Sequence, residues 1–170
     1  MTGADRPRVP EALAASLPSP ERRRQGPYPV FECFQRIPCN PCATVCDQGV
    51  IEEFADLNDL PRANYDAACT ACARCVAVCP GLSCFLIDET YSDTEATVTL
   101  AYEYLPLPED GETVEALDRE GNPAGPARVV RVRHRKRPER TPLVTLAVPV
   151  GRVHVVRGFR RREGEGGSHG

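Results

Sequence analysis

Eight of the nine cysteines in this chain lie in two short runs whose spacing is that of metal ligands. The second run has the pattern C-x2-C-x2-C-x3-C-P and consists of Cys69, Cys72, Cys75, Cys79 and Pro80. Three thiolates placed at every third residue can wrap one iron–sulfur cubane and point at three of its irons. Thr70, Ala71 and Ala73 between them are small, which lets backbone N–H groups approach the sulfurs. This run is therefore expected to hold an iron–sulfur cluster.

The first run keeps the end of this pattern but widens its beginning. It has the pattern C-x5-C-x2-C-x3-C and consists of Cys33, Cys39, Cys42 and Cys46. The residues from Phe34 to Pro38 fill the widened gap and should bulge around a cluster. Asp47 stands where the second run has a proline. Incomplete occupancy of this first site stays open as an alternative.

Residues 27–90 resemble a bacterial-type dicluster ferredoxin, because the second run is the one that such proteins use. In two-cluster ferredoxins the fourth cysteine of a run ligates the other cluster. The resemblance therefore implies two [4Fe-4S] clusters with crossed ligands. The first would be held by Cys33, Cys39, Cys42 and Cys79, and the second by Cys69, Cys72, Cys75 and Cys46.

A narrower resemblance comes from the segments around the first run. Residues 27–33 read Pro-Tyr-Pro-Val-Phe-Glu-Cys, and residues 36–42 read Arg-Ile-Pro-Cys-Asn-Pro-Cys. Both are similar to ferredoxin-type subunits of flavin-dependent amino-acid oxidoreductases of the proline, hydroxyproline and opine kind. That resemblance implies a larger flavoprotein partner, with FAD or FMN, that carries the flavin and substrate sites.

Two zinc sites or disulfides are the alternatives for the same cysteines. Structural zinc favours two C-x2–4-C knuckles separated by a loop, which triply spaced cysteines fit poorly. The N-terminus is rich in Pro, Ala and Arg without the apolar stretch of a secretory signal, and the cytosol keeps thiols reduced. We therefore expect a cytoplasmic, metal-binding protein. A zinc-stapled interaction or nucleic-acid-binding module stays open as a function of another class.

Cys84 lies outside both runs, in the apolar segment from Leu82 to Ile87. The burial habit of free cysteine favours a small buried hydrophobic side chain. The other interpretation makes Cys84 a replacement ligand for the site of the first run.

The elements that must position these cysteines divide the chain into four parts. We expect a flexible N-terminal arm over residues 1–26, a dicluster ferredoxin domain over 27–90, a small β domain over 91–158 and a disordered tail over 159–170. The β domain is predicted by alternating apolar residues in Thr97–Tyr104, in Val130–Arg133 and in Val144–Val148, separated by turn residues. The expected class is α+β: a pseudo-symmetric ferredoxin fold followed by a small antiparallel, barrel-like β domain.

Several function classes lack their motifs in this sequence. There is no G-x-G-x-x-G after a strand, no G-x-S-x-G, no H-E-x-x-H and no stretch of about 18 apolar residues. His134, His154 and His169 are scattered and are expected to be exposed and not to bind metal. We therefore expect a chain without catalytic residues or a membrane span.

Charge is divided unevenly along the chain. Residues 1–127 carry 21 acidic and 9 basic side chains, whereas residues 128–162 carry 1 acidic and 12 basic. The basic run from Arg128 to Arg140 is interpreted as the solvated face of a strand or as a docking patch for an acidic partner. Nucleic-acid binding is less favoured, because no aromatic residues interleave with the basic ones.

Taken together, these features predict an electron-transfer iron–sulfur subunit that relays single electrons to or from a flavin-containing oxidoreductase. A stand-alone soluble ferredoxin is the alternative of the same class.

Overall fold

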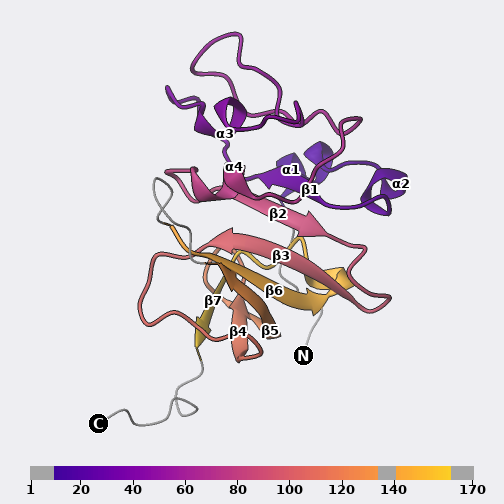
Figure 1. Cartoon of the computed structure of the whole chain (residues 1–170), viewed down its shortest axis with the longest axis vertical. Helices are drawn as coiled ribbons and strands as arrows, with labels where there is room; N and C mark the ends of the chain where they lie inside the picture. Colours follow the sequence, from indigo (N-terminus) through magenta and orange to yellow (C-terminus); the bar gives the residue numbers. More distant parts are fainter. Residues whose placement is uncertain (1–9, 134–140, 162–170) are drawn as a thin grey trace.

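The computed structural model of the chain describes residues 10–133 and 141–161. Its main feature is an antiparallel sheet of seven strands in the order β1-β2-β3-β6-β5-β4-β7 (Figure 1). The strands are β1 (Tyr28–Phe31), β2 (Cys84–Asp88), β3 (Glu95–Ala101), β4 (Thr113–Leu117), β5 (Pro123–Arg133), β6 (Leu143–Pro149) and β7 (Gly158–Arg161). The helices of the described residues are short: α1 (Glu11–Ser16), α2 (Pro20–Arg23), α3 (Pro41–Thr44), α4 (Arg74–Ala77) and the 3-10 turn η1 (Val150–Arg152).

One face of the sheet, which we call the core face, carries the main hydrophobic core. Val98 of β3 pairs with Leu146 of β6, and Leu100 pairs with Val144. These four side chains are at most 3% exposed. Full burial of such a side chain stabilises the fold by about 1.5–3 kcal/mol. The alternation that predicted these strands therefore reflects packing on one side of the sheet.

The opposite face, which we call the cysteine face, carries the loops that hold the cysteine runs. A smaller core lies between these loops and the sheet, made of Ala73, Val76, Ala77, Cys84, Leu86 and Leu143. Helix α4 contacts both β2 and β3, and in Figure 1 it lies directly above β2. The sheet is thus the platform on which the cysteines are arranged.

The sheet runs without a break across the expected boundary at residue 90. Leu86 and Ile87 of β2 pair with Thr99 and Val98 of β3. Among the described strands, β1 and β7 form the two edges, so the sheet is open rather than closed into a barrel. The coarse α+β class, a sheet with few helices, is confirmed, and the finer ferredoxin fold stays part of the proposal below. The barrel-like β domain that the sequence predicted is therefore corrected to an open sheet, because β1 and β7 leave two edges unpaired among the described strands.

Both ends of the described chain are more ordered than expected. Leu13 of α1 is fully buried in the main core, and Arg22 Nε donates a hydrogen bond to the Tyr65 carbonyl at 2.7 Å. At the other end, β7 pairs with β4, and Phe159 is only 6% exposed. Residues 11–26 and 159–161 therefore pack on the sheet, where a flexible arm and a disordered tail were expected. In the described chain, no helix has the length and apolar character needed to cross a membrane.

Candidate metal centre

Each cysteine run carries one short helix, and the two helices contact each other. Helix α3 contains Cys42 and helix α4 contains Cys75. The Asp47 carboxylate, directly after the first run, accepts a hydrogen bond from the guanidinium of Arg74 at the start of α4. The aspartate that replaces the usual proline therefore ties the end of the first run to the second.

The thiol of Cys79, from the second run, lies among the cysteines of the first run. Burial raises the pKa of Cys33, and the neighbouring Cys79 and Cys39 thiols raise it further. Burial also raises the pKa of Cys42 to about 11, and the thiols of Cys79, Cys75 and Cys39 add to this in that order. Charges act on a pKa in this way only at close range. Cys79 is thus close to Cys33 and Cys42, as crossed ligation of the first cluster requires, and Cys75 of the second run is close to Cys42 as well.

The thiol of Cys46, from the first run, lies in turn among the cysteines of the second run. Cys46, Cys69, Cys72 and Cys75 line one cavity together. Burial raises the pKa of Cys69, and the thiols of Cys75, Cys72 and Cys46 contribute in the same direction. The cavity encloses about 20 Å³, which is about the room that one water needs. This volume is too small for a cubane, so the cluster assignment requires these thiols to stand farther apart in the metal-bound protein.

The described side chains form no ready site for a single metal ion. In the part of the chain that the structure describes, no three Cys, His, Asp or Glu side chains are grouped closely enough to hold one. A tetrahedral zinc site brings its sulfurs to about 3.8 Å from one another, because each lies about 2.3 Å from the same ion. The four thiolates of a cubane bind four different irons and stand farther apart.

Backbone N–H donors point at sulfurs in both sets of thiols. We call Cys33, Cys39, Cys42 and Cys79 the first group, and Cys69, Cys72, Cys75 and Cys46 the second group. The Ser83 N–H donates to Cys79 Sγ at 3.3 Å. Three further N–H groups approach sulfurs and oppose the effect of burial on their pKa values: Gln35 at Cys33, Ala43 at Cys42, and Ala71 at Cys69. Hydrogen bonds of this kind stabilise thiolates and tune cluster potentials.

Two alanines in the second run adopt the left-handed backbone conformation. Ala71 has a φ of 57° and Ala73 a φ of 56°. This conformation costs a residue with a side chain about 1–2 kcal/mol. Such strain persists where the surroundings demand it, often at functional sites. Here the left-handed conformation of Ala71 and Ala73 turns the backbone of residues 69–75 around the space between the thiols.

Cys84, at the start of β2, is 2% exposed, so its predicted burial is confirmed. A hydrogen bond with Cys75 raises the pKa of Cys84 well above its usual value, and burial adds to this. Cys79 and Cys42 are also among its neighbours. Cys84 thus lies between the two groups of four, in a contact that its place outside the runs did not reveal.

A buried charge cluster holds the chain at the first cysteine. Glu32, directly before Cys33, accepts hydrogen bonds from Arg119 Nε at 3.1 Å and Nη2 at 2.9 Å, and another from Arg157 Nε. The Arg157 guanidinium also lies 4.8 Å from the centre of the Phe85 ring. The side chains of Glu32 and Arg157 are only 11% and 4% exposed. No motif pointed to this cluster, because its members are far apart in the sequence.

His154 does not fit the expectation of an exposed histidine. Its side chain is 14% exposed, and its Nε2 lies 3.1 Å from Glu89 Oε1. Its ring stacks on that of Tyr28, whose hydroxyl donates to the same carboxylate oxygen. Burial lowers the pKa of His154 in spite of the opposing effect of Glu89. The expectation for His134 and His169 concerns residues outside the described ranges, as does most of the basic run after Arg133.

A comparison of this chain with protein-family models, with curated proteins and with solved structures finds no match.

Proposed function

We propose that this chain is an iron–sulfur protein that carries two [4Fe-4S] clusters and passes electrons between partners. The observation that supports the proposal is the nearness of Cys79 to Cys33 and Cys42, together with the cavity that Cys46 lines with Cys69, Cys72 and Cys75. Each cluster would take up and release one electron at a time.

Within this proposal the chain supplies both the ligands and their support. One cluster is assigned to Cys33, Cys39, Cys42 and Cys79, and the other to Cys69, Cys72, Cys75 and Cys46. The N–H groups that approach the sulfurs, such as that of Ser83, favour the charged thiolates. The strained turn at Ala71 and Ala73 shapes the loop around the second group.

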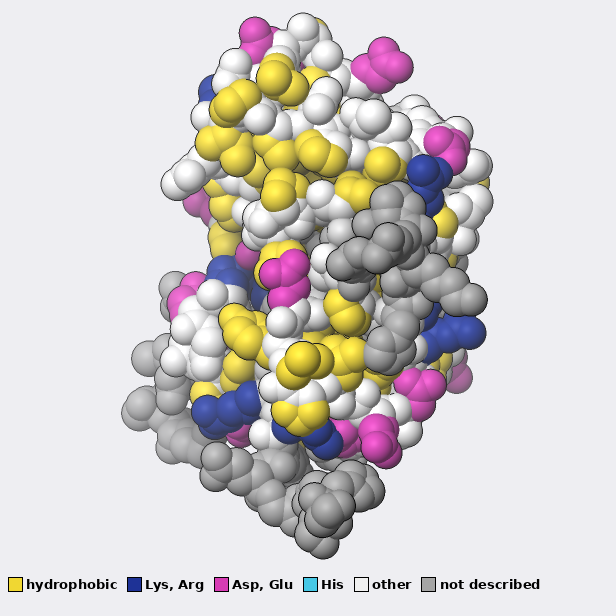
Figure 2. Space-filling view, turned by 60° about the vertical axis from the view of Figure 1, so that its left-hand side comes forward, with side chains coloured by type: hydrophobic (Ala, Val, Ile, Leu, Met, Phe, Trp, Pro, Cys, Tyr) yellow, Lys and Arg dark blue, Asp and Glu magenta, His cyan; other side chains and the backbone are white. Residues whose placement is uncertain are grey.

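The proposed partner is a larger flavin-containing oxidoreductase subunit. Large apolar side chains are exposed around the first group: Phe34 is 50% exposed, Ile37 46% and Leu57 49%. The Cys39 N–H donates to the Leu57 carbonyl at 3.1 Å, so the loops that carry them are joined. Figure 2 shows hydrophobic side chains gathered over the cysteine-rich end of the face that it draws. Exposed apolar patches of this kind mark protein–protein contacts.

Crossed ligation is tested by serine variants. Cys79→Ser should halve the iron content and expose Cys33, Cys39 and Cys42 to an alkylating reagent, while Cys69, Cys72 and Cys75 stay protected. Cys46→Ser should give the reverse pattern. Mass spectrometry of the alkylated peptides reads both results, and Cys84→Ser, which removes no assigned ligand, should keep both clusters. Exposure of the mutated cysteine's own run in both variants would show that ligation is local.

The partner is tested by isolation of the chain from its native cells under anaerobic conditions. A flavoprotein should co-purify with the chain, and Phe34→Ser combined with Ile37→Ser should release it. Tyr104→Ser is the matched control, because Tyr104 is 72% exposed and its ring contacts Tyr102, which stacks on Phe159 of β7. A free monomer that still carries clusters would favour the stand-alone ferredoxin.

A further inference from the structure

A cavity of about 230 Å³ opens on the cysteine face of the sheet, next to the loop of the second group. No cysteine lines this cavity, so it is separate from the candidate metal centre. Its floor includes a row of residues in register across four strands: Leu86, Thr99, Thr145 and Arg131. Ala71 forms part of the wall on the side of the cysteine loop.

A β-bulge in β5 places two arginines on this cavity. Val129 pairs with Leu146, but the next partner along β6, Thr145, pairs with Arg131, which leaves Val130 as the extra residue. Regular alternation would turn Arg131 toward the core face, the side on which Val129 is fully buried. The bulge instead puts Arg131 and Arg133 on the cysteine face and returns Val132 to the core. Bulges commonly re-aim side chains next to functional sites.

At the arginine end of the cavity, the polar side chains are hydrogen-bond donors. Thr99 Oγ1 and Thr145 Oγ1 lie 2.8 Å apart, so one hydroxyl proton joins them and the other is left to donate elsewhere. Thr97 and Thr99 are 8% and 4% exposed at the floor. In the described residues, no carboxylate pairs with Arg131. Arg133 Nη1 donates to the Cys72 carbonyl at 3.4 Å and so joins the cavity wall to the loop of the second group.

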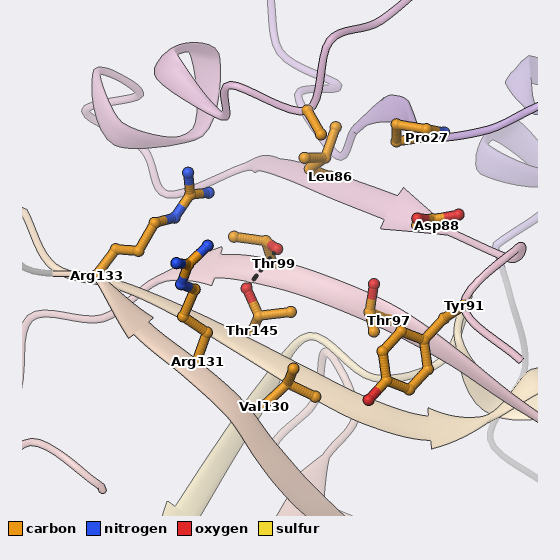
Figure 3. Close-up of a pocket in the computed structure, with 11 residues that line it drawn as sticks. Pro27, Leu86, Asp88, Tyr91, Thr97, Thr99, Val130, Arg131, Arg133 and Thr145 are labelled. Atoms are coloured by element: carbon orange, nitrogen blue, oxygen red, sulfur yellow. Dashed lines mark hydrogen bonds between the residues drawn. The ribbon is translucent and has the colours of Figure 1, made fainter. Parts of the chain in front are cut away.

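The two ends of the cavity differ in charge. Figure 3 shows the guanidinium groups of Arg131 and Arg133 beside the Thr99–Thr145 pair, with Asp88 and Tyr91 at the other end. The Asp88 carboxylate already accepts hydrogen bonds from the Thr90 N–H and hydroxyl. A negative group would therefore be held at the arginine end and repelled from the end with Asp88.

We propose that this cavity binds a small molecule through an oxyanion group, either a carboxylate or a phosphate. Guanidinium groups present paired N–H donors that match the oxygens of both, and the threonine hydroxyls add neutral donors beneath them. Leu86, Val130 and the Tyr91 ring supply apolar surface for the rest of the ligand. The volume lies below the roughly 300 Å³ at which pockets for drug-sized ligands begin, so the ligand is small.

The site also couples to the second group of cysteines, and this step rests on the proposed function. An anion next to the loop of Ala71 and Cys72 disfavours an added electron there, because like charges repel. By linkage, reduction weakens anion binding by the same factor. A tenfold weaker affinity in the reduced protein would lower the midpoint potential of the neighbouring cluster by about 59 mV.

The binding test uses the full chain, titrated calorimetrically with inorganic phosphate and separately with acetate at constant ionic strength. We expect saturable binding of at least one of the two anions, which also tells which oxyanion the cavity prefers. Arg131→Gln should weaken this binding about tenfold or more, and Thr145→Val should weaken it less. Arg160→Gln is the matched control, because its side chain is 61% exposed on β7 outside the cavity, and it should bind as the unaltered chain does.

Absence of saturable binding of both anions would overturn the proposal, and so would equal losses in Arg131→Gln and Arg160→Gln. Most of the lining, including Thr99, Thr145 and Arg131, belongs to the sheet and does not depend on the assigned cluster ligands. Failure of the cluster assignment, read from iron and sulfide content, is therefore distinguishable from failure of the anion site, read from anion binding. In the cluster-loaded protein the bound anion should lower one midpoint potential in the unaltered chain but not in Arg131→Gln. An identical shift in both proteins would contradict the coupling.

Discussion

At the residue scale, Glu32 shows how a buried charge positions a candidate ligand. Its carboxylate joins Arg119 and Arg157, which come from distant parts of the chain, immediately before Cys33. Removal of one partner from a buried pair leaves the other charge without compensation, which typically costs about 3–5 kcal/mol. The same contact therefore contributes to stability and fixes where the first cysteine begins its loop.

We expect Glu32→Gln to lower the free energy of unfolding by about 3 kcal/mol, since two buried guanidinium groups lose their counter-charge. Urea unfolding measures this change. Glu115→Gln is the control, because Glu115 pairs with Arg160, which is 61% exposed, and such surface pairs are worth under about 1 kcal/mol. Equal losses in the two variants would contradict a special role for the Glu32 cluster.

The same carboxylate predicts a pH dependence. Burial opposes ionisation of Glu32, but the hydrogen bonds and charges of Arg119 and Arg157 prevail and hold its pKa below the ordinary value of 4.5. A carboxyl whose pKa is lowered by folding stabilises the fold above its unfolded pKa, and this contribution is lost as the pH falls through the folded value. Unfolding free energies between pH 7 and 3 should therefore fall more steeply below pH 4.5 in the unaltered chain than in Glu32→Gln. Parallel curves of unfolding free energy against pH in the two proteins would contradict the assigned contribution of the Glu32 carboxylate.

At the scale of elements, local pattern predicted some strands and not their partners. The alternation of Val98 and Leu100 predicted β3 because one side of that strand is buried. The pairing of β1 with β2 was not predictable from spacing, because Tyr28 and Ile87 meet across the whole cysteine segment. The bulge at Val130 was not predicted, because the alternation of Val and Arg is regular from Val130 to Arg133. The doubled valine at 129 and 130 breaks that alternation, and the register with β6 shows that a bulge lies there.

The candidate site followed more directly from sequence than the fold did. Ligand spacing depends on local geometry, so both cysteine runs could be found without knowledge of the sheet. The contact of Cys84 with Cys75 could not, because β2 must first pack beneath α4. The left-handed conformation of Ala71 and Ala73 was also not foreseen, because alanine rarely adopts it.

Replacement of these two alanines by glycine tests the strain. Ala71→Gly should raise the free energy of unfolding by about 1 kcal/mol, because glycine adopts a positive φ without penalty. Ala73→Gly should change stability little, because Ala73 is 1% exposed and the lost methyl offsets the gain by about 0.8 kcal/mol. Denaturant unfolding of both variants under anaerobic conditions measures the difference. A loss of stability in Ala71→Gly would contradict the assigned strain.

At the scale of the whole molecule, the sheet and the cysteine loops depend differently on metal. The sheet has its own core on the face away from the cysteines. The loops, by contrast, contain few buried apolar side chains besides Val50, Ile51 and Val76. Cluster binding should therefore supply much of the folding free energy of residues 33–82 and little of that of the sheet.

Chelation or oxidative loss of the clusters should raise amide hydrogen exchange across residues 33–82 while β3 and β6 stay protected. The strands serve as the internal control, because they share the molecule but not the ligands. Protection that stays unchanged across residues 33–82 after cluster loss would show that the loops fold without metal.

The most direct test of the central claim is metal and sulfide analysis of the chain purified without oxygen. Two cubanes require about eight irons and about eight acid-labile sulfides per chain, together with a brown colour that chelation bleaches. Stoichiometric zinc without labile sulfide would contradict the account, and the cysteines would then belong to a zinc-stapled module.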